Sequence, residues 1–192
     1  MKKIVTSLFV ISSFLMISMQ SGFAHFHYEA AATTVLQTNK DNKLSALKQS
    51  WVYDPEVTDM MLKDNDDLKS FGKGLITDLD KLGYFTQLKL DGKVLKTTKV
   101  ETYTLEKEGK DEDTRLKLTF TLPLKTPVAL KGKTTLLIDH TDKSASAIIY
   151  YDTATSITFS KALEPHCIAD VKDKKDYEHG ETPQLVKVFC ET

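Results

Sequence analysis

The chain has 192 residues, with 26 basic and 27 acidic side chains and a formal net charge of −1. The charges are mixed along the chain and no basic stripe with interleaved aromatic residues appears, which argues against a nucleic-acid partner. Arg115 is the only arginine, which argues against bidentate recognition of phosphate or carboxylate as the main task.

The first 24 residues have the pattern of a secretory signal peptide. A basic start, Met1-Lys2-Lys3, precedes an uncharged apolar run over residues 4–19, and Gly22 and Ala24 are small residues at the positions a signal peptidase inspects. The apolar run is too short for a membrane anchor. We therefore expect cleavage after Ala24, export to the periplasm, and a single domain over residues 25–192 with no membrane span.

Cleavage after Ala24 would create an N-terminus suited to metal binding. His25 would offer a free α-amine and an imidazole, and His27 a second imidazole. In one geometry the amine and imidazole of His25 chelate the metal and another side chain completes the site. In the other, the amine, two deprotonated amides and the imidazole of His27 form a square-planar set. The second favours Cu(II) or Ni(II), whereas the first also suits Zn(II).

Two alternatives remain open for this pair. One extra residue before His25 would separate the amine from it and move His27 to the fourth position, so both geometries depend on the cleavage point. The two histidines can also flank the first strand without binding anything, since imidazole pairs without a metal are common.

The first half of the mature chain predicts a hairpin followed by two helices. Residues 26–37 and 44–53 read as strands around a turn cluster at 38–42. Asp54 and Pro55 suit the cap and first position of a helix reaching about residue 62. Apolar residues at spacings of three and four predict a second helix over about 66–82, with Gly83 as its C-cap.

The second half predicts strands throughout. The expected strands are 84–90, then after the Asp91-Gly92 turn 94–105, 115–122, 133–140, 145–151, 156–160 and 185–189. Pro123 and Pro127 are expected to break the chain before the strand at 133. The fold class that follows is α+β, mainly antiparallel and sandwich-like, with one helical pair inserted after the N-terminal hairpin.

The two cysteines, Cys167 and Cys190, predict one disulfide, because exported thiols rarely stay reduced. The alternative is a pair of thiolate metal ligands. His140 is a further candidate ligand because the carboxylates of Asp139 and Asp142 flank it and can orient its ring or share a metal.

Three other residues near these candidates have weaker claims. Glu29 shares strand parity with His25 and His27, so the three side chains are expected on one face. His166 adjoins Cys167 and is expected to be placed by the disulfide, and His179 is expected in a solvated loop.

No nucleophile elbow, phosphate-binding glycine loop or His-Glu-x-x-His motif is present, so we do not expect an enzyme.

Several segments, taken in order, resemble a family of exported proteins, domain of unknown function 1007. The matching segments are Ala24-His25-Phe26-His27, Trp51-Val52-Tyr53-Asp54, Leu82-Gly83-Tyr84-Phe85-Thr86 with Asp91-Gly92, Phe120-Thr121-Leu122-Pro123-Leu124 with Pro127, and Asp139. The resemblance implies a periplasmic accessory of nickel-, cobalt- or zinc-type membrane permeases. Many members have a longer, calcium-loop-like stretch between the helices. Here the sixth and twelfth loop positions would be Lys69 and Leu75, so we expect no calcium site, and Asp64 or Asp66 as a helix cap.

The sequence thus predicts a periplasmic transition-metal-binding accessory for an inner-membrane metal permease. Zn(II) is the expected ion, with Ni(II) or Cu(II) as alternatives. His25 and His27 are the expected ligands, with His140 and Asp139 as weaker candidates. The competing hypothesis is a metal-free periplasmic interaction module that docks on a transport system.

Overall fold

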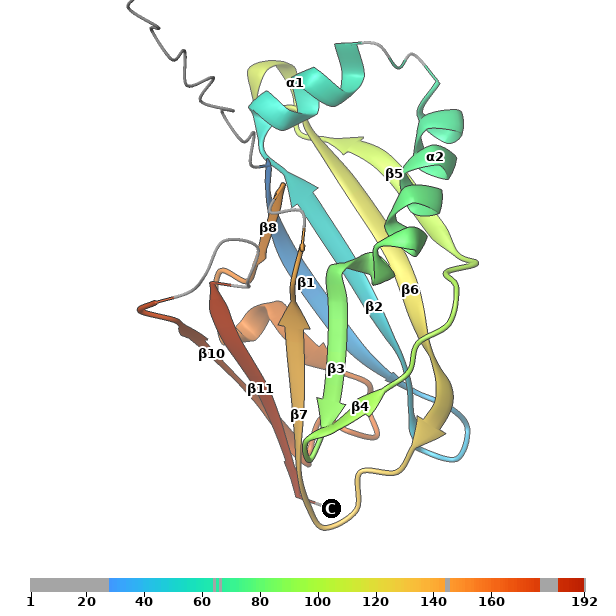
Figure 1. Cartoon of the computed structure of the whole chain (residues 1–192), viewed down its shortest axis with the longest axis vertical. Helices are drawn as coiled ribbons and strands as arrows, with labels where there is room; N and C mark the ends of the chain where they lie inside the picture. Colours follow the sequence, from blue (N-terminus) through green and yellow to red (C-terminus); the bar gives the residue numbers. More distant parts are fainter. Residues whose placement is uncertain (1–27, 64, 66, 144–145, 177–182, 192) are drawn as a thin grey trace, which may run out of the picture.

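The computed structural model describes residues 28–63, 65, 67–143, 146–176 and 183–191 (Figure 1). They form two mostly antiparallel sheets and two α-helices, which confirms the α+β, sandwich-like prediction. No helix in these ranges is long and apolar enough to cross a membrane.

The longer sheet, sheet A, has the strand order β5-β6-β2-β1-β8, and β9 also pairs with β1. Its strands are β1 (Tyr28–Thr38), β2 (Leu44–Tyr53), β5 (Tyr103–Glu108), β6 (Arg115–Val128), β8 (Ala147–Tyr150) and β9 (Ile157–Phe159). The hairpin predicted from the first strands is present as β1–β2, in which Ala32 lies opposite Trp51. Only β8 and β9 run parallel to their neighbour, β1.

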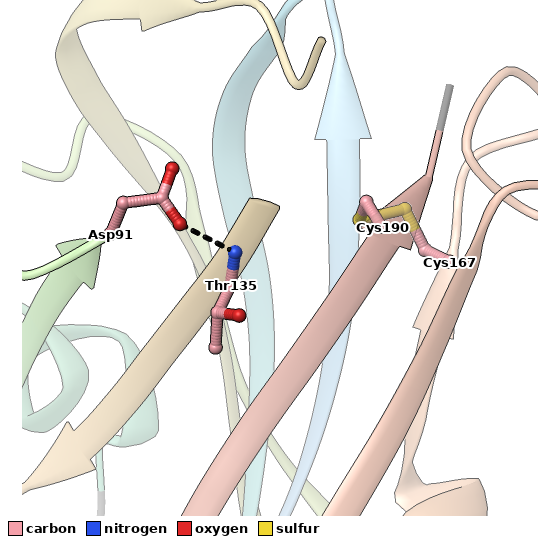
Figure 2. The surroundings of a disulfide bond; sticks show 4 residues. All are labelled: Asp91, Thr135, Cys167 and Cys190. Carbon is pink, nitrogen blue, oxygen red and sulfur yellow. Dashed lines mark hydrogen bonds between the residues drawn. A yellow bond between two sulfur atoms is a disulfide. The ribbon is translucent and has the colours of Figure 1, made fainter. Parts of the chain in front are cut away.

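The second sheet, sheet B, has the order β10-β11-β7-β3-β4 and is antiparallel throughout. Its strands are β3 (Thr86–Leu90), β4 (Lys93–Leu95), β7 (Lys133–His140), β10 (Cys167–Asp173) and β11 (Gln184–Glu191). The predicted Asp91-Gly92 turn joins β3 to β4, and both residues have positive φ, as a tight two-residue hairpin requires. The Asp91 carboxylate accepts a hydrogen bond of 2.8 Å from the Thr135 amide, which fixes this turn to β7 (Figure 2).

The helical pair lies where it was predicted, after the first hairpin. Helix α1 (Pro55–Lys63) begins after Asp54, whose Oδ1 accepts a hydrogen bond of 2.7 Å from the Val57 amide, so the predicted cap is confirmed. Helix α2 (Leu68–Lys81) is capped by Asp67 through a 3.0 Å bond from the Lys69 amide. The predicted caps Asp64 and Asp66 lie outside the described residues.

The inner face of sheet A is covered by two different layers. Figure 1 shows α2 over one end of sheet A and sheet B in front of the other end. Trp51 lies at the centre of the core, fully buried, with its ring edge-on to Phe120 and stacked with Phe85. Trp51 is therefore a packing residue. The short turn Gly83–Phe85 joins α2 to β3 of sheet B.

The strand predictions differ from the structure in three places. Residues 94–105 do not form one strand: β4 belongs to sheet B and β5 to sheet A, so the chain between them crosses between the sheets. The prolines do not end a strand, because β6 continues through Pro123 and Pro127, and the register of its partner β2 shifts opposite Pro123, where a missing amide is tolerated. Strand β10, which is short and rich in charge, was not predicted.

Candidate functional site

The N-terminal site predicted at His25 and His27 lies outside the described residues, but the strand that follows it is firmly placed. The Tyr28 amide donates a 2.9 Å hydrogen bond to the Ser146 carbonyl, and its ring lies 5.9 Å from that of Tyr53. Burial, and secondarily the Asp142 carboxylate, raises the pKa of the Tyr28 hydroxyl to about 12. The start of β1 therefore lies between the end of β2 and the start of β8.

Asp142 organises the loop beside that point. Its carboxylate is buried, and Oδ2 accepts bonds of 2.8 Å from both the amide and the hydroxyl of Ser146 and of 2.9 Å from the Ala147 amide. These hydrogen bonds to one carboxylate oxygen close the loop. Asp142 thus has a structural use next to the start of β1, in addition to flanking His140 in sequence.

On the outer face of sheet A, charged groups surround Tyr150 near the start of β1. Burial is the main cause of the raised pKa of Tyr150, and the carboxylates of Asp152, Glu29 and Asp54 raise it further, while Arg115 opposes them. Glu29 is exposed on β1. The strand that follows the two histidines therefore begins in acidic surroundings, which favour a cation.

His140 is buried inside the sandwich, where both ring nitrogens have partners. Nδ1 lies 3.3 Å from the hydroxyl of Thr86, and Nε2 lies 2.9 Å from the hydroxyl of Tyr151. The Tyr151 hydroxyl is in turn 2.8 Å from that of Thr34. Burial lowers the pKa of the His140 imidazole to about 4, so the ring is neutral at physiological pH.

The hydrogen-bond chain defines the tautomer of that ring. The single hydroxyl proton of Thr86 goes to the Tyr84 carbonyl at 2.8 Å, so Nδ1–H of His140 donates to the Thr86 oxygen. Nε2 of the neutral ring then accepts the proton of Tyr151. The lone pair that a metal would need is therefore occupied by a hydrogen bond in the core.

Asp139 and His140 point to opposite faces of β7. His140 faces the core, whereas Asp139 is half-buried on the outer face of sheet B, where it accepts a 3.2 Å bond from the Thr141 hydroxyl. The structure therefore does not bring this pair together. In the described part of the chain, no group of three or more His, Cys, Asp and Glu residues is arranged to hold a metal ion.

The cysteines form the predicted disulfide. Cys167 and Cys190 lie directly opposite each other on β10 and β11, and their sulfur atoms are bonded (Figure 2). Their sulfurs are thus not thiolate ligands in this form. His166, next to Cys167, is exposed, and His179 lies outside the described residues.

Sequence reasoning missed the polar network around His140. Gln49 donates to Thr86 at 3.3 Å and accepts from the Trp51 indole at 3.0 Å, and with Thr34 and Tyr151 it lies in the core. A signal was available: Thr34 and Gln49 occupy the inward parity of strands whose other inward residues are apolar. A buried polar side chain at such a position needs a partner from elsewhere in the fold.

Comparison with known proteins identifies the family. A search among curated proteins finds no match. The family model described as "Protein of unknown function (DUF1007)" matches residues 10–185, which is most of the chain, including the Trp51 strand, the turn after α2 and β7. The chain therefore belongs to the DUF1007 family.

Proposed function

We propose that the mature protein is a periplasmic accessory that binds a transition-metal ion, Zn(II) in first place, and presents it to an inner-membrane metal permease. The observation that carries the proposal is the position of the Ala24-His25-Phe26-His27 junction directly before a fixed strand. Cleavage after Ala24 would supply one amine and two imidazoles there. Nitrogen donors of this kind bind Zn(II), Ni(II) and Cu(II), and lose their protons easily near neutral pH.

The surroundings of the start of β1 support this choice over the other histidines. Three carboxylates add negative charge at this end of sheet A, and each of them raises the pKa of Tyr150: Glu29, Asp54 and Asp152. His140, by contrast, already uses both nitrogens in the core. The proposal therefore rests on His25 and His27 and gives His140 and Asp139 no direct part in holding the metal.

Metal titration by calorimetry tests the proposal. The mature protein beginning at His25 is titrated with zinc, nickel and copper, beside the double variant His25→Ala, His27→Ala. A matched control carries one additional alanine before His25, which keeps both imidazoles but moves the amine. We expect tight one-to-one binding that the double variant loses and the extended protein weakens.

The same titration distinguishes the two metal-binding geometries, and one of its outcomes would contradict the proposal. A preference for Cu(II) or Ni(II), with strong loss on extension, indicates the square-planar set, whereas zinc binding that survives extension indicates an imidazole site. Equal, weak binding by all three proteins contradicts the proposal. Mass spectrometry of the exported protein checks that His25 is the first residue.

The second candidate is a metal-free docking module, and one observation favours it. Ile168 and Phe189 lie opposite each other on the outer face of sheet B and are 69% and 38% exposed. Large apolar side chains left in solvent as a pair are typical of a binding surface. A protein that binds no metal, but associates with a permease through a defined surface, would support this function instead.

A further inference from the structure

A hollow lies where the end of α2 meets the first strands of sheet B. It has a volume of about 490 Å³, and its lining includes Leu82, Phe85, Val94, Lys96 and Lys143. A second hollow of about 280 Å³ shares Leu82, Phe85, Thr141 and Lys143 with it. We refer to the two together as the α2–β4 groove. Its size is that of a binding site for a small molecule or a short peptide segment.

An unusual turn supplies part of the lining of the groove through Gly83 and Phe85. Gly83, Tyr84 and Phe85 follow one another with φ values of 61°, 53° and 48°, all in the left-handed region. Such a conformation costs about 1–2 kcal/mol for each residue that is not glycine. It persists only where the surrounding structure holds it in place.

Contacts on both sides hold this turn. The Tyr84 hydroxyl accepts a 2.9 Å bond from the Val100 amide and donates to Asp80 at 3.1 Å, and its ring stacks with Phe120. The Phe85 carbonyl accepts a 2.9 Å bond from the Thr141 amide. This part of the groove lining is therefore preformed, which lowers the entropic cost of binding.

The walls of the groove are apolar and exposed. Leu82 is 50% exposed and Val94 is 57% exposed, and both line the larger hollow. Leu82 is the C-cap of α2 and Val94 lies on β4, so the two side chains come from different elements. An occupant with an apolar side chain would remove both from water.

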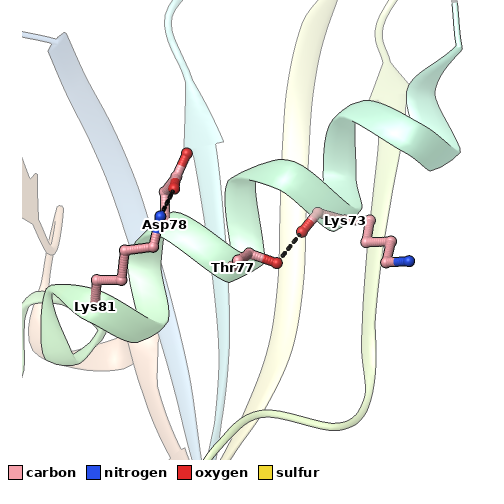
Figure 3. Close-up of polar contacts among 4 residues, drawn as sticks. All are labelled: Lys73, Thr77, Asp78 and Lys81. Atoms are coloured by element: carbon pink, nitrogen blue, oxygen red, sulfur yellow. Dashed lines mark hydrogen bonds and ion pairs between the residues drawn. The ribbon is translucent and has the colours of Figure 1, made fainter.

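The rim of the groove is positively charged. Lys96 and Lys143 are exposed and form no ion pair with another described residue, whereas Lys81 is held by Asp78 at 2.7 Å (Figure 3). Asp142 is the only carboxylate among the described lining residues of the two hollows, and it is buried with three hydrogen bonds to Oδ2. The groove is thus cationic on a chain whose net charge is −1.

We infer that the α2–β4 groove binds an acidic peptide segment of a partner protein, with an apolar side chain between Leu82 and Val94 and carboxylates at Lys96 and Lys143. Lys96 and Lys143 favour carboxylates on the peptide, whereas Leu82 and Val94 favour an apolar side chain. The inference rests on the proposed function in one respect, the periplasmic location of the partner. Loops on that side of a membrane protein are depleted in lysine and arginine, which suits a cationic groove.

Selection from a random peptide library displayed on phage tests the inference with an unbiased probe. The mature protein is the target, and the selected peptides are synthesised with a fluorescent label for binding by anisotropy. We expect a consensus with aspartate or glutamate next to leucine, isoleucine or phenylalanine. The double variant Lys96→Glu, Lys143→Glu is expected to weaken binding of that peptide by at least about tenfold.

Two further variants make the result specific to the groove. Lys40→Glu, Lys131→Glu changes the net charge equally at exposed lysines outside the groove lining and is expected to change the affinity less than about twofold. Val94→Ser replaces an exposed apolar side chain of the groove lining without changing its charge. It is expected to weaken binding of the peptide. Circular dichroism checks that each variant is folded.

Several outcomes overturn the inference. They are a basic consensus, no enriched peptide, or equal loss of binding in the groove and control lysine variants. Metal titration of the groove variant separates this result from the proposed function, because Lys96 and Lys143 take no part in the N-terminal site. If the groove variant loses peptide binding but binds metal as the wild type does, the result supports peptide binding in the groove. A negative result in one assay does not affect the interpretation of the other.

Discussion

Nε2 of His140 lies 2.9 Å from the hydroxyl oxygen of Tyr151, and this contact joins the two sheets. His140 ends β7 of sheet B, whereas Tyr151 follows β8 of sheet A and contacts Thr34 on β1. The only buried imidazole in the described part of the chain is therefore a structural element of the core, and its protonation state is coupled to the stability of the whole sandwich.

The first prediction concerns acid. Because the pKa of His140 falls from its ordinary value of about 6.5 to about 4 on folding, the unfolded chain binds more protons between these values. The stabilising contribution is complete above pH 6.5 and is lost as pH falls toward 4. Its full size is about 3 kcal/mol, of which about 2 kcal/mol is lost by pH 5. Urea unfolding at pH 7 and pH 5 measures the change.

The variant His140→Gln provides the control for acid unfolding. It removes the titrating group while retaining a donor and an acceptor, so its free energy of unfolding should fall less between pH 7 and pH 5 than that of the wild type. The carboxylates titrate in both proteins and cancel in the comparison. An equal fall in both proteins would show that His140 does not carry the acid sensitivity.

The second prediction concerns Tyr151→Phe. This change removes the hydroxyl that joins His140 to Thr34 and leaves two buried polar atoms without their partner. We expect a loss of about 1–3 kcal/mol in the free energy of unfolding. The matched control is Tyr150→Phe, whose hydroxyl makes no hydrogen bond with a described residue, and we expect a change below about 0.5 kcal/mol. Similar losses in both variants would argue against the network.

The third prediction compares two glycines of α2. A Cβ at Gly74 would have no heavy atom within 4 Å, whereas one at Gly72 would lie 3.2 Å from Cβ of Leu105. Gly74→Ala should therefore stabilise the protein by about 0.5–1 kcal/mol through helix propensity. Gly72→Ala should gain less or destabilise, because β5 resists displacement. Thermal unfolding ranks the two variants, and a larger gain at Gly72 would contradict the packing of α2 on β5.

The fourth prediction concerns the disulfide. Cys167 and Cys190 are separated by 23 residues and form the bond between β10 and β11. Replacing both by serine should lower the free energy of unfolding by roughly 3 kcal/mol, as the chain-entropy model gives for a loop of this size. Mass spectrometry after alkylation should find no free thiol in the native protein. Unchanged stability of the serine variant would mean that the loop is already constrained when the protein is unfolded.

Local patterns in the sequence predicted the parts of the fold that depend on neighbouring residues. The β1–β2 hairpin, the Asp54 cap of α1, the Asp91-Gly92 turn and the disulfide all agree with the structure. Each depends on interactions within a few residues or on the redox chemistry of cysteine. The same patterns failed at residues 94–105 and at Pro123, because membership of a sheet and tolerance of a proline depend on distant strands.

The same distinction between local pattern and tertiary structure applies to the two pairs of candidate metal ligands. His25 and His27 are a prediction from the sequence alone, because the amine and imidazoles would be brought together by cleavage and adjacency in the chain. Asp139 and His140 are also adjacent, but strand alternation directs them to opposite faces of β7. Adjacency in the sequence therefore does not bring these two side chains to one site.

The sequence by itself determined the class of fold, the N-terminal hairpin with the helical pair after it, the cysteine pair and the motifs that resemble the family. Only the tertiary structure decided that His140 lies in the core with Tyr151, Thr86 and Gln49, and that the turn at Gly83 lines a cationic groove. The reason is physical: hydrogen bonds in the core and walls of a groove join residues that are distant in the chain, and their positions are set by the packing of the two sheets.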